Sequence, residues 1–216
     1  MSLIPQTTLP ETASRLMAEL AKPVSPQDDA GYIYIFWLTS TSQPSTPPAE
    51  AARSLLSPPG SSTRDRPANG RRPSDVLASF ASPTDGTTSR GLGDSSAGGK
   101  KILLKIGRAT NVQRRLNEWQ RQCGYNLSLI RYYPYVPSSA PATAAEAVRK
   151  VPHSHKVERL VHLELTGLGL RVADREKCSA CGKEHREWFE VDASRKAVEV
   201  VDDVVRRWSD WDEAQG

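Results

Sequence analysis

The sequence predicts a small α+β domain, and three kinds of pattern carry this prediction. Two runs, 32–38 and 101–107, are dense in β-branched, aliphatic and aromatic residues, as expected of buried strands. Three others have apolar residues at helical spacing, within 111–124, 155–165 and 197–208. Much of the rest of the 216 residues is rich in Pro and Ser. Roughly 130 residues remain for the packed part, which is enough for one domain around a single core.

Local signals indicate where individual elements begin and end. Asn111 is expected to cap the first of the three helices, and Gly124 to end it. A further strand is expected over 127–136, where it is interrupted by Pro134. A short strand is also expected over 187–191.

Two segments are expected to be insertions into the domain. More than half of residues 41–99 are Pro, Gly, Ser or Thr, so this segment cannot bury enough surface to offset its ordering entropy and is predicted to be disordered. A shorter Ala- and Pro-rich insertion is expected at 138–151. We therefore divide the chain into an N-terminal arm, 1–29, and an interrupted domain, 30–212. The arm contains an amphipathic run at 11–21, which is either a loosely docked helix or part of a disordered arm.

Charge and hydropathy favour some classes of protein and exclude others. The formal charge is +4, from 29 Lys and Arg against 25 Asp and Glu, which suits a polyanionic partner. No stretch approaches the ~18 consecutive apolar residues of a membrane span, and the N-terminus lacks the pattern of a secretory signal. We therefore expect an intracellular protein with no membrane partner. The long insertion carries arginines that could contact a polyanion, although a solvated linker is the simpler interpretation: Arg64, Arg66, Arg71 and Arg72.

The two predicted strands and the helix that follows them carry three short motifs in order. The first strand begins with Gly-Tyr-Ile-Tyr at 31–34, the second ends with Lys-Ile-Gly at 105–107, and Arg115 lies on the helix. This arrangement resembles the GIY-YIG nuclease superfamily, in which a strand bearing Gly-Ile-Tyr pairs with one ending in Tyr-Ile-Gly. Tyr34 is the better match for the first tyrosine and Tyr32 the second choice. In the second motif, lysine replaces tyrosine.

Further motifs resemble one branch of this superfamily. The lysine variant, the spacing of Glu158 and His162, and Glu-Trp-Phe at 187–189 are similar to the bacteriophage T-five open-reading-frame DNA-binding domain family, which also contains fungal meiotically up-regulated proteins. The resemblance covers 31–38 and 101–191. It implies a small antiparallel three-stranded sheet flanked by helices, with the long disordered insertion between the first two strands.

The resemblance implies roles for several of these residues. Glu158 matches the superfamily's metal-binding glutamate, and a single carboxylate with several retained waters suits Mg²⁺. His162 projects from the same helix face, four residues later. Tyr34, or else Tyr32, would accept or position a proton, and would need a nearby cation such as Lys105 to lower its pKa. The structural alternatives are a solvated carboxylate and a packed aromatic ring.

Cations around this site would bind phosphate. Arg115 matches the helix arginine of the superfamily, and its forked donors suit phosphate oxygens. Arg108, Arg114 and Arg121 lie on or beside the same helix and would extend a basic face along a nucleic-acid backbone, unless they simply form a solvated charged helix. Glu187 is expected to reach the site, whereas the two aromatic residues after it are expected in the core.

Three cysteines and a histidine predict a second metal site. Cys178, Cys181 and His185 place three candidate ligands within eight residues, and the spacing suits two zinc ligands, with the histidine as a plausible third. Cys123, at the end of a predicted helix, is the expected fourth ligand. Two histidines could replace it, His153 and His155. Buried free thiols or a redox pair are the alternatives. Zinc with four protein ligands would be structural, because no position is left for water.

Three classes of function are compatible with these patterns. The first is a Mg²⁺-dependent endonuclease that hydrolyses phosphodiester bonds. The second is a DNA-binding module that keeps the fold and the cations but does not cleave. The third is a protein-interaction scaffold whose Pro- and Ser-rich insertion binds the partner. We expect a nucleic-acid partner, with DNA as the first choice, and a nuclear location. Nothing in the sequence indicates an oligomeric state.

Overall fold

A computed structural model describes four stretches of the chain: 3–38, 101–135, 149–172 and 177–215. The predicted insertion at 41–99 lies outside the described residues, and so does most of the one predicted at 138–151. Within the described part, no helix has the length and apolar character that a membrane span requires.

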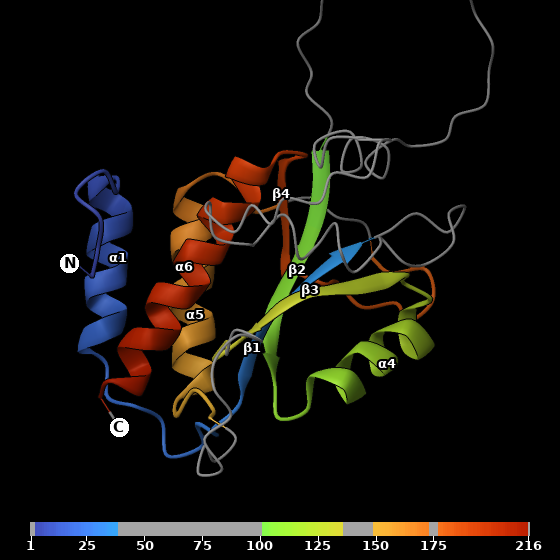
Figure 1. The fold of residues 1–216 in the computed structure, drawn as a ribbon, viewed down its shortest axis with the longest axis horizontal. Helices are drawn as coiled ribbons and strands as arrows, with labels where there is room; N and C mark the ends of the chain where they lie inside the picture. The colour runs from blue at the N-terminus through green and yellow to red at the C-terminus, as the bar shows by residue number, and fades with distance from the viewer. Residues whose placement is uncertain (1–2, 39–100, 136–148, 173–176, 216) are drawn as a thin grey trace, which may run out of the picture.

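The described residues form an α+β fold, as predicted (Figure 1). The strands are Tyr32–Leu38 (β1), Lys101–Ala109 (β2), Leu127–Tyr133 (β3) and Trp188–Asp192 (β4). The helices are Pro10–Ala21 (α1), Val112–Cys123 (α4), Ser154–Gly167 (α5) and Arg195–Glu213 (α6).

The sheet has one strand more than predicted. Its order is β3-β1-β2-β4, and every neighbouring pair is antiparallel. β4 pairs along β2 from Lys101 opposite Asp192 to Lys105 opposite Trp188. The expectation of three strands was therefore wrong, because β4 supplies partners for the backbone groups at the free edge of β2.

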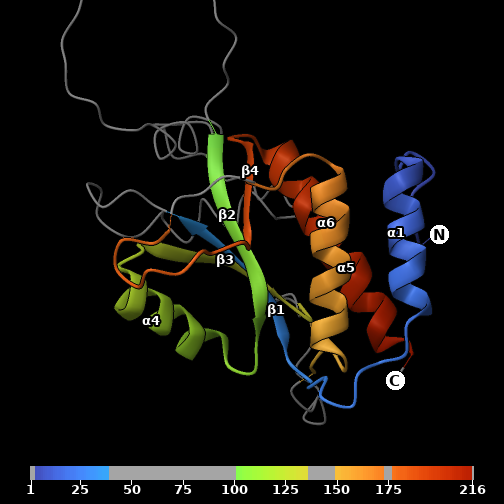
Figure 2. The same ribbon diagram turned by 180° about the vertical axis from the view of Figure 1, so that it is seen from behind.

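Helices cover both faces of the sheet (Figure 2). α5 and α6 pack on one face and α4 on the other, while α1 packs against α5. Leu16 of α1 is fully buried in the core shared with α5 and α6. The N-terminal arm therefore carries a docked helix, which was one of the two possibilities left open by its amphipathic sequence.

Alternation along β1 divides the core into two clusters. Ile33, Ile35 and Trp37 point to the α5 and α6 side, whereas Tyr34 and Phe36 point to the α4 side. Successive side chains of a strand lie on opposite faces, so both sides of this central strand are buried. The fully apolar run of β1 is the sequence signal of that double burial.

Local signals placed the α4 boundaries correctly but not those of the second insertion. The Asn111 side chain accepts a hydrogen bond from the Arg114 backbone N–H at 2.9 Å, and Gly124 ends the helix with φ of 64°. Val151, expected within the insertion, is fully buried and forms a two-hydrogen-bond bridge with Gly31. That insertion therefore ends before Val151.

Candidate functional site

A pocket of about 310 Å³ opens between the N-terminal part of α4 and helix α5, and we call it the polar pocket. Tyr34 of β1 lines it, together with residues at the end of β2 and from both helices. Its charged lining residues are Arg108, Arg114, Arg115, Glu118, Glu158 and Glu187. Segments far apart in the sequence thus meet at this pocket. It is lined by residues of β1, the end of β2, α4 and α5, and by Glu187.

Tyr34 reaches the pocket because its cross-strand neighbour is a glycine. Tyr34 lies opposite Gly107, and a Cβ at that position would come within 2.6 Å of the tyrosine hydroxyl oxygen. The tyrosine ring also stacks on Phe36, with centroids 4.1 Å apart. Tyr32, the second choice for the motif tyrosine, does not line the pocket; its ring packs edge-on against Tyr132 instead.

The environment of Tyr34 keeps its hydroxyl protonated. Burial, together with the negative charge of Glu187, raises the pKa of Tyr34 to about 12, and the nearby guanidinium of Arg115 only partly opposes this. The cation close to this hydroxyl is therefore Arg115 rather than Lys105. A tyrosine with this pKa donates a hydrogen bond at neutral pH and does not act as a free base.

Lys105 lies beneath the pocket and does not line it. Its side chain is fully buried, and its Nζ donates to Glu187 Oε2 at 2.7 Å and lies 3.8 Å from the ring centre of Trp119. Burial lowers the pKa of Lys105. Burial alone would raise the pKa of Glu187, but the Lys105 ammonium lowers it, so Glu187 stays a carboxylate. Lys105 therefore positions Glu187, whose side chain is 36% exposed.

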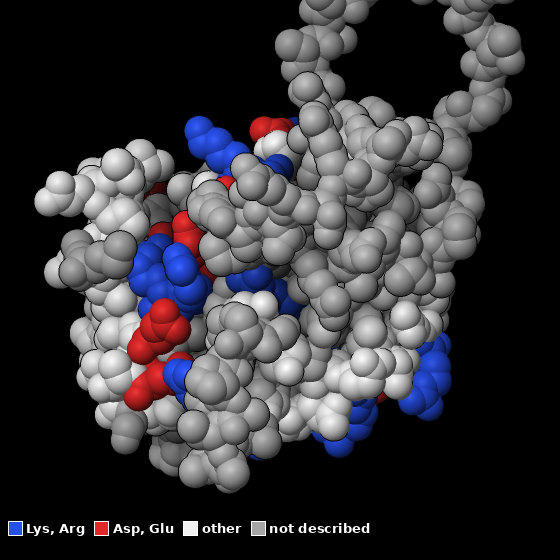
Figure 3. Space-filling view, viewed as in Figure 1, with Lys and Arg blue, Asp and Glu red and all other residues white. Residues whose placement is uncertain are grey.

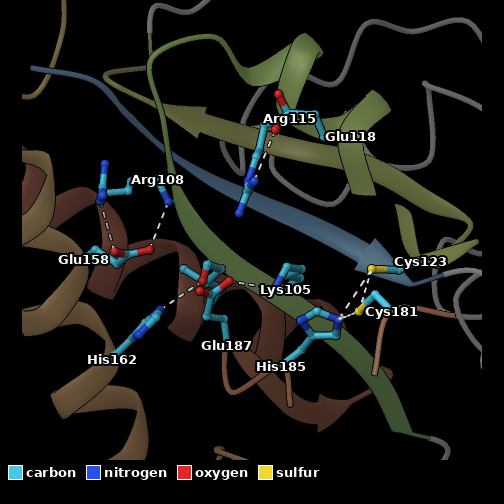
Figure 4. A network of polar contacts seen from close by, with 11 residues as sticks. Lys105, Arg108, Arg115, Glu118, Cys123, Glu158, His162, Cys181, His185 and Glu187 are labelled. Atoms are coloured by element: carbon cyan, nitrogen blue, oxygen red, sulfur yellow. Dashed lines mark hydrogen bonds and ion pairs between the residues drawn. The ribbon is translucent and has the colours of Figure 1, made fainter. Parts of the chain in front are cut away.

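Glu158 lies across the pocket from α4 and is held by Arg108. Its Oε1 accepts from the Arg108 backbone N–H at 3.1 Å, and its Oε2 lies 3.4 Å from Arg108 Nε. Burial and the charge of Glu187 raise the pKa of Glu158 to about 7. Figure 4 shows the Arg115 side chain extending from α4 toward β2, with Glu158 on the other side of that strand in this view.

His162 is turned away from the polar pocket. Its Nε2 donates to the Ile106 carbonyl oxygen at 2.9 Å, and its ring packs on Phe189. Burial lowers the pKa of His162. His162 follows Glu158 by four residues, but its ring faces the backbone of β2 and does not line the polar pocket. The expected partnership of Glu158 and His162 in one site is therefore not seen.

The arginines of α4 divide into two groups. Arg114 and Arg115 line the pocket and form ion pairs with Glu118 at 3.5 and 3.2 Å. Arg121, in the last turn, is exposed and does not line the pocket. In Figure 3 the surface over α4, at the lower right, shows basic side chains with few acidic ones. At the left of the same face, acidic and basic side chains are mixed. Glu118 was missed by the sequence analysis, although its spacing from both arginines is that of a helical ion pair.

The four predicted zinc ligands lie together. Their donor atoms are all within 4.8 Å of one another, and His185 Nε2 lies 3.4 Å from Cys123 Sγ and 3.2 Å from Cys181 Sγ (Figure 4). A tetrahedral zinc ion with bonds of about 2.3 Å holds its ligand atoms about 3.7 Å apart, so the set fits such an ion. His153, one of the alternatives to Cys123, instead contacts Asp212 at 2.9 Å. This Cys₃His cluster could hold a metal ion.

A tight turn shapes the cluster. Gly182 adopts φ of 68°, and its N–H donates to the Cys178 carbonyl at 2.7 Å. The Cys181 backbone N–H is the largest of the contributions that lower the pKa of Cys178 to about 6. Burial raises the pKa of Cys123 to about 12. A turn whose N–H groups point at a sulfur favours the thiolate that a metal ligand must become.

Trp119 links the polar pocket to the Cys₃His cluster. The His185 ring lies edge-on against the Trp119 ring at 4.7 Å, and Lys105 lies over the same ring. Glu187 follows His185 by two residues. Trp119 falls on the apolar face of the helix predicted within 111–124, and no local signal distinguishes it from an ordinary core residue.

Comparison with known proteins supports a family relationship. The family model described as "Meiotically up-regulated gene 113" matches residues 101–211. The meiotically up-regulated gene 113 protein of Schizosaccharomyces pombe is 29% identical over 120 residues, which cover 56% of this chain and 32% of that protein. This chain therefore spans about a third of the length of that curated relative. No solved structure matches. The matched residues include both candidate metal sites, at Glu158 and at the Cys₃His cluster, but they do not include Tyr34.

Proposed function

This chain belongs to the meiotically up-regulated gene 113 family, and from the geometry of its polar pocket we propose that it binds the phosphodiester backbone of DNA through a domain of the GIY-YIG nuclease type. The observation that carries the proposal is the convergence of Tyr34, Arg115 and Glu158 from β1, α4 and α5 on one pocket. The order of the motifs in the sequence is that of the superfamily, and this convergence is what such a site requires.

Arg115 and Tyr34 would contact the phosphate. The guanidinium offers paired donors to two phosphate oxygens, and the protonated Tyr34 hydroxyl adds a third donor. Arg115 is 37% exposed, and its ion pair with Glu118 is of the surface helical type, worth roughly 0.3–0.5 kcal/mol. A phosphate can therefore replace Glu118 as the partner of Arg115 at little cost.

A second candidate function is hydrolysis of the bound phosphodiester with Mg²⁺. The observation that favours it is that two carboxylates, Glu158 and Glu187, line the same pocket as the arginines. Glu158 Oε2 is held by an ion pair with Arg108 Nε at 3.4 Å, a contact too long for a strong hydrogen bond, and a magnesium ion could take the place of Arg108 as the partner of this oxygen. A magnesium ion held there would neutralise phosphate charge and lower the pKa of a bound water.

The Cys₃His cluster would hold a structural zinc ion. Four protein ligands fill a tetrahedral site, and the ion would fix the segment before Glu187 to the end of α4. Metal analysis of the purified protein tests this assignment. We expect about one equivalent of zinc, and less than about half an equivalent would end it.

Binding is tested by titrating a labelled duplex two helical turns long at several salt concentrations. For Arg115→Gln we expect a loss of about tenfold in affinity and a salt slope smaller by about 0.9, as for one lost phosphate contact. Arg121→Gln removes the same charge from the same helix outside the pocket, and its loss of affinity should be smaller. Equal losses for both variants, or no binding by the native protein, would contradict the proposal.

Cleavage is tested by nicking of supercoiled plasmid with and without Mg²⁺. If the second candidate function holds, nicking requires Mg²⁺ and is lost in Glu158→Gln while DNA binding remains. Tight binding by the native protein without any nicking selects the non-cleaving module instead.

A further inference from the structure

A second hollow, of about 430 Å³, lies between α1 and α5, and we call it the basic groove. Four cationic side chains line it. Arg15 comes from α1 and Arg159 from α5, whereas Lys22 and Arg171 come from the segments that follow these two helices. One carboxylate, that of Glu19, is present among them. The groove therefore carries a clear excess of positive charge, which suits a polyanionic occupant.

Glu19 organises two of these cations and leaves the other two available. Its Oε2 accepts from Lys22 Nζ at 2.7 Å, and its Oε1 lies 3.0 Å from Arg159 Nε. Among the described residues, neither Arg15 nor Arg171 forms an ion pair with a carboxylate. Glu19 is nearly buried, so it acts as a fixed counter-charge that orients Lys22 and Arg159.

The basic groove and the polar pocket are neighbours along one helix. Glu158 of α5 lines the polar pocket, whereas Arg159 and His162 line the groove. Figure 2 shows α5 standing between α1 and the β2 strand. Four residues of helix rise about 6 Å, so both cavities border the same turn of α5. A duplex two helical turns long is long enough to contact both.

From this juxtaposition we propose that the basic groove binds flanking phosphates of the same DNA whose backbone enters the polar pocket. The inference rests on the proposed function and extends it to a longer DNA contact. Arg15 lies on α1 and Lys22 directly follows it, and both are outside the residues 101–211 that the family model matches. The N-terminal arm thus contributes half of the contact, and it does so by the packing of α1 on α5.

The test compares the double variant Arg15→Gln/Arg171→Gln with native protein on two ligands. One is a duplex two helical turns long, and the other is a dinucleoside monophosphate, whose single phosphate can occupy only the polar pocket. We expect the double variant to lose about tenfold or more in affinity for the duplex, with a salt slope smaller by about 1.8 for two lost phosphate contacts. Its affinity for the dinucleoside monophosphate should equal that of native protein. Arg206→Gln, an exposed charge of α6 outside both cavities, is the matched control and should change neither.

The outcomes separate failure of the groove from failure of the pocket. If the double variant binds the duplex as tightly as native protein while Arg115→Gln still weakens binding, the groove proposal is wrong and the pocket proposal stands. If native protein binds neither ligand, both are wrong. Loss of binding to a polyglutamate peptide, with duplex affinity unchanged, would assign the groove to an acidic protein and would also overturn the DNA assignment. Both arginines are exposed, so unchanged thermal unfolding verifies that the variant is folded.

Discussion

The two sides of the central strands β1 and β2 bury different kinds of side chain. On the side that faces α5 and α6, these two strands contribute only apolar side chains to the core, among them Ile33, Ile35 and Trp37. The buried carboxylates on that side come from the helices and are paired, as Glu164 is with Arg207. The side that faces α4 buries a lysine ammonium and a tyrosine hydroxyl, and the cysteine cluster lies at its edge. Lys105 is paired with Glu187, but a buried ion pair adds little net stability compared with apolar side chains of similar volume, so packing alone does not explain this lysine.

This difference separates the side of the sheet whose buried residues mainly stabilise the fold from the side on which we propose that the ligand binds. We expect that the buried apolar side chains between the sheet and the helices α5 and α6 can be exchanged for others of similar volume with an effect on stability alone. On the α4 side, Lys105, Trp119 and His185 form a chain of contacts from the polar pocket to the Cys₃His cluster. Substitutions there should change ligand binding as well as stability.

The largest effect should come from the Cys₃His cluster. Cys181→Ser, or removal of the metal by a chelator, should lower the free energy of unfolding on the order of 5 kcal/mol, a fraction of the binding energy of small structural zinc sites. DNA affinity should fall with it, because Glu187 follows the cluster directly. Thermal unfolding and DNA titration measure both. If chelation leaves both unchanged, the cluster has no structural metal.

A core substitution on the opposite side should separate stability from binding. Leu160 of α5 is fully buried in the core between the sheet and α6, so Leu160→Ala should lower the free energy of unfolding by about 3 kcal/mol. DNA affinity, measured well below the unfolding temperature, should be unchanged. A large loss of affinity in folded protein would show that the two sides of the sheet are not functionally distinct.

A smaller stability change with a specific binding defect is expected at Gly107. In Gly107→Ala the new Cβ would lie 2.6 Å from the Tyr34 hydroxyl oxygen, so the tyrosine ring must move. We expect a loss of about 1–3 kcal/mol in stability, as for overpacking, and weaker DNA binding. Tyr34→Phe is the matched comparison, because it removes the hydroxyl without the clash. Unchanged affinity in both variants would remove Tyr34 from the binding site.

The smallest stability effect should follow replacement of Lys105 by an apolar side chain of similar length. Lys105→Met removes a buried charge, and the partly exposed Glu187 can turn to solvent, so the free energy of unfolding should change by about 1 kcal/mol or less. DNA titration should nevertheless show a change in affinity, because Glu187 loses its fixed position. A loss of stability as large as in Leu160→Ala would show that Lys105 is mainly structural.

The fold was predictable wherever a local signal was strong. The Asn111 cap and the left-handed Gly124 fixed the ends of α4, and the uninterrupted apolar run of β1 indicated a strand buried on both sides. The fourth strand was present as a local signal at 187–191, but its pairing with β2 is a long-range contact that no local pattern encodes. The burial of Val151 against Gly31 was hidden for the same reason.

The sequence predicted which residues form the site, but not how their side chains are oriented. Motif order led to Tyr34, Arg115, Glu158 and Glu187, which the fold brings to one pocket. The direction of His162, toward the β2 backbone, depends on how far α5 is rotated against the sheet, and helical spacing from Glu158 does not fix that. The basic groove was missed because its two halves come from α1 and from α5 with the segment that follows it, and neither half shows a cluster in the sequence.

The central claim is that DNA lies against the α4 side and along α5, and hydrogen–deuterium exchange with and without bound duplex tests it most directly. We predict slower exchange in residues 108–118 and 156–163 on binding, and unchanged exchange in the peptides of α6. Slower exchange confined to α6 or to β3, with the α4 and α5 segments unaffected, would contradict the account.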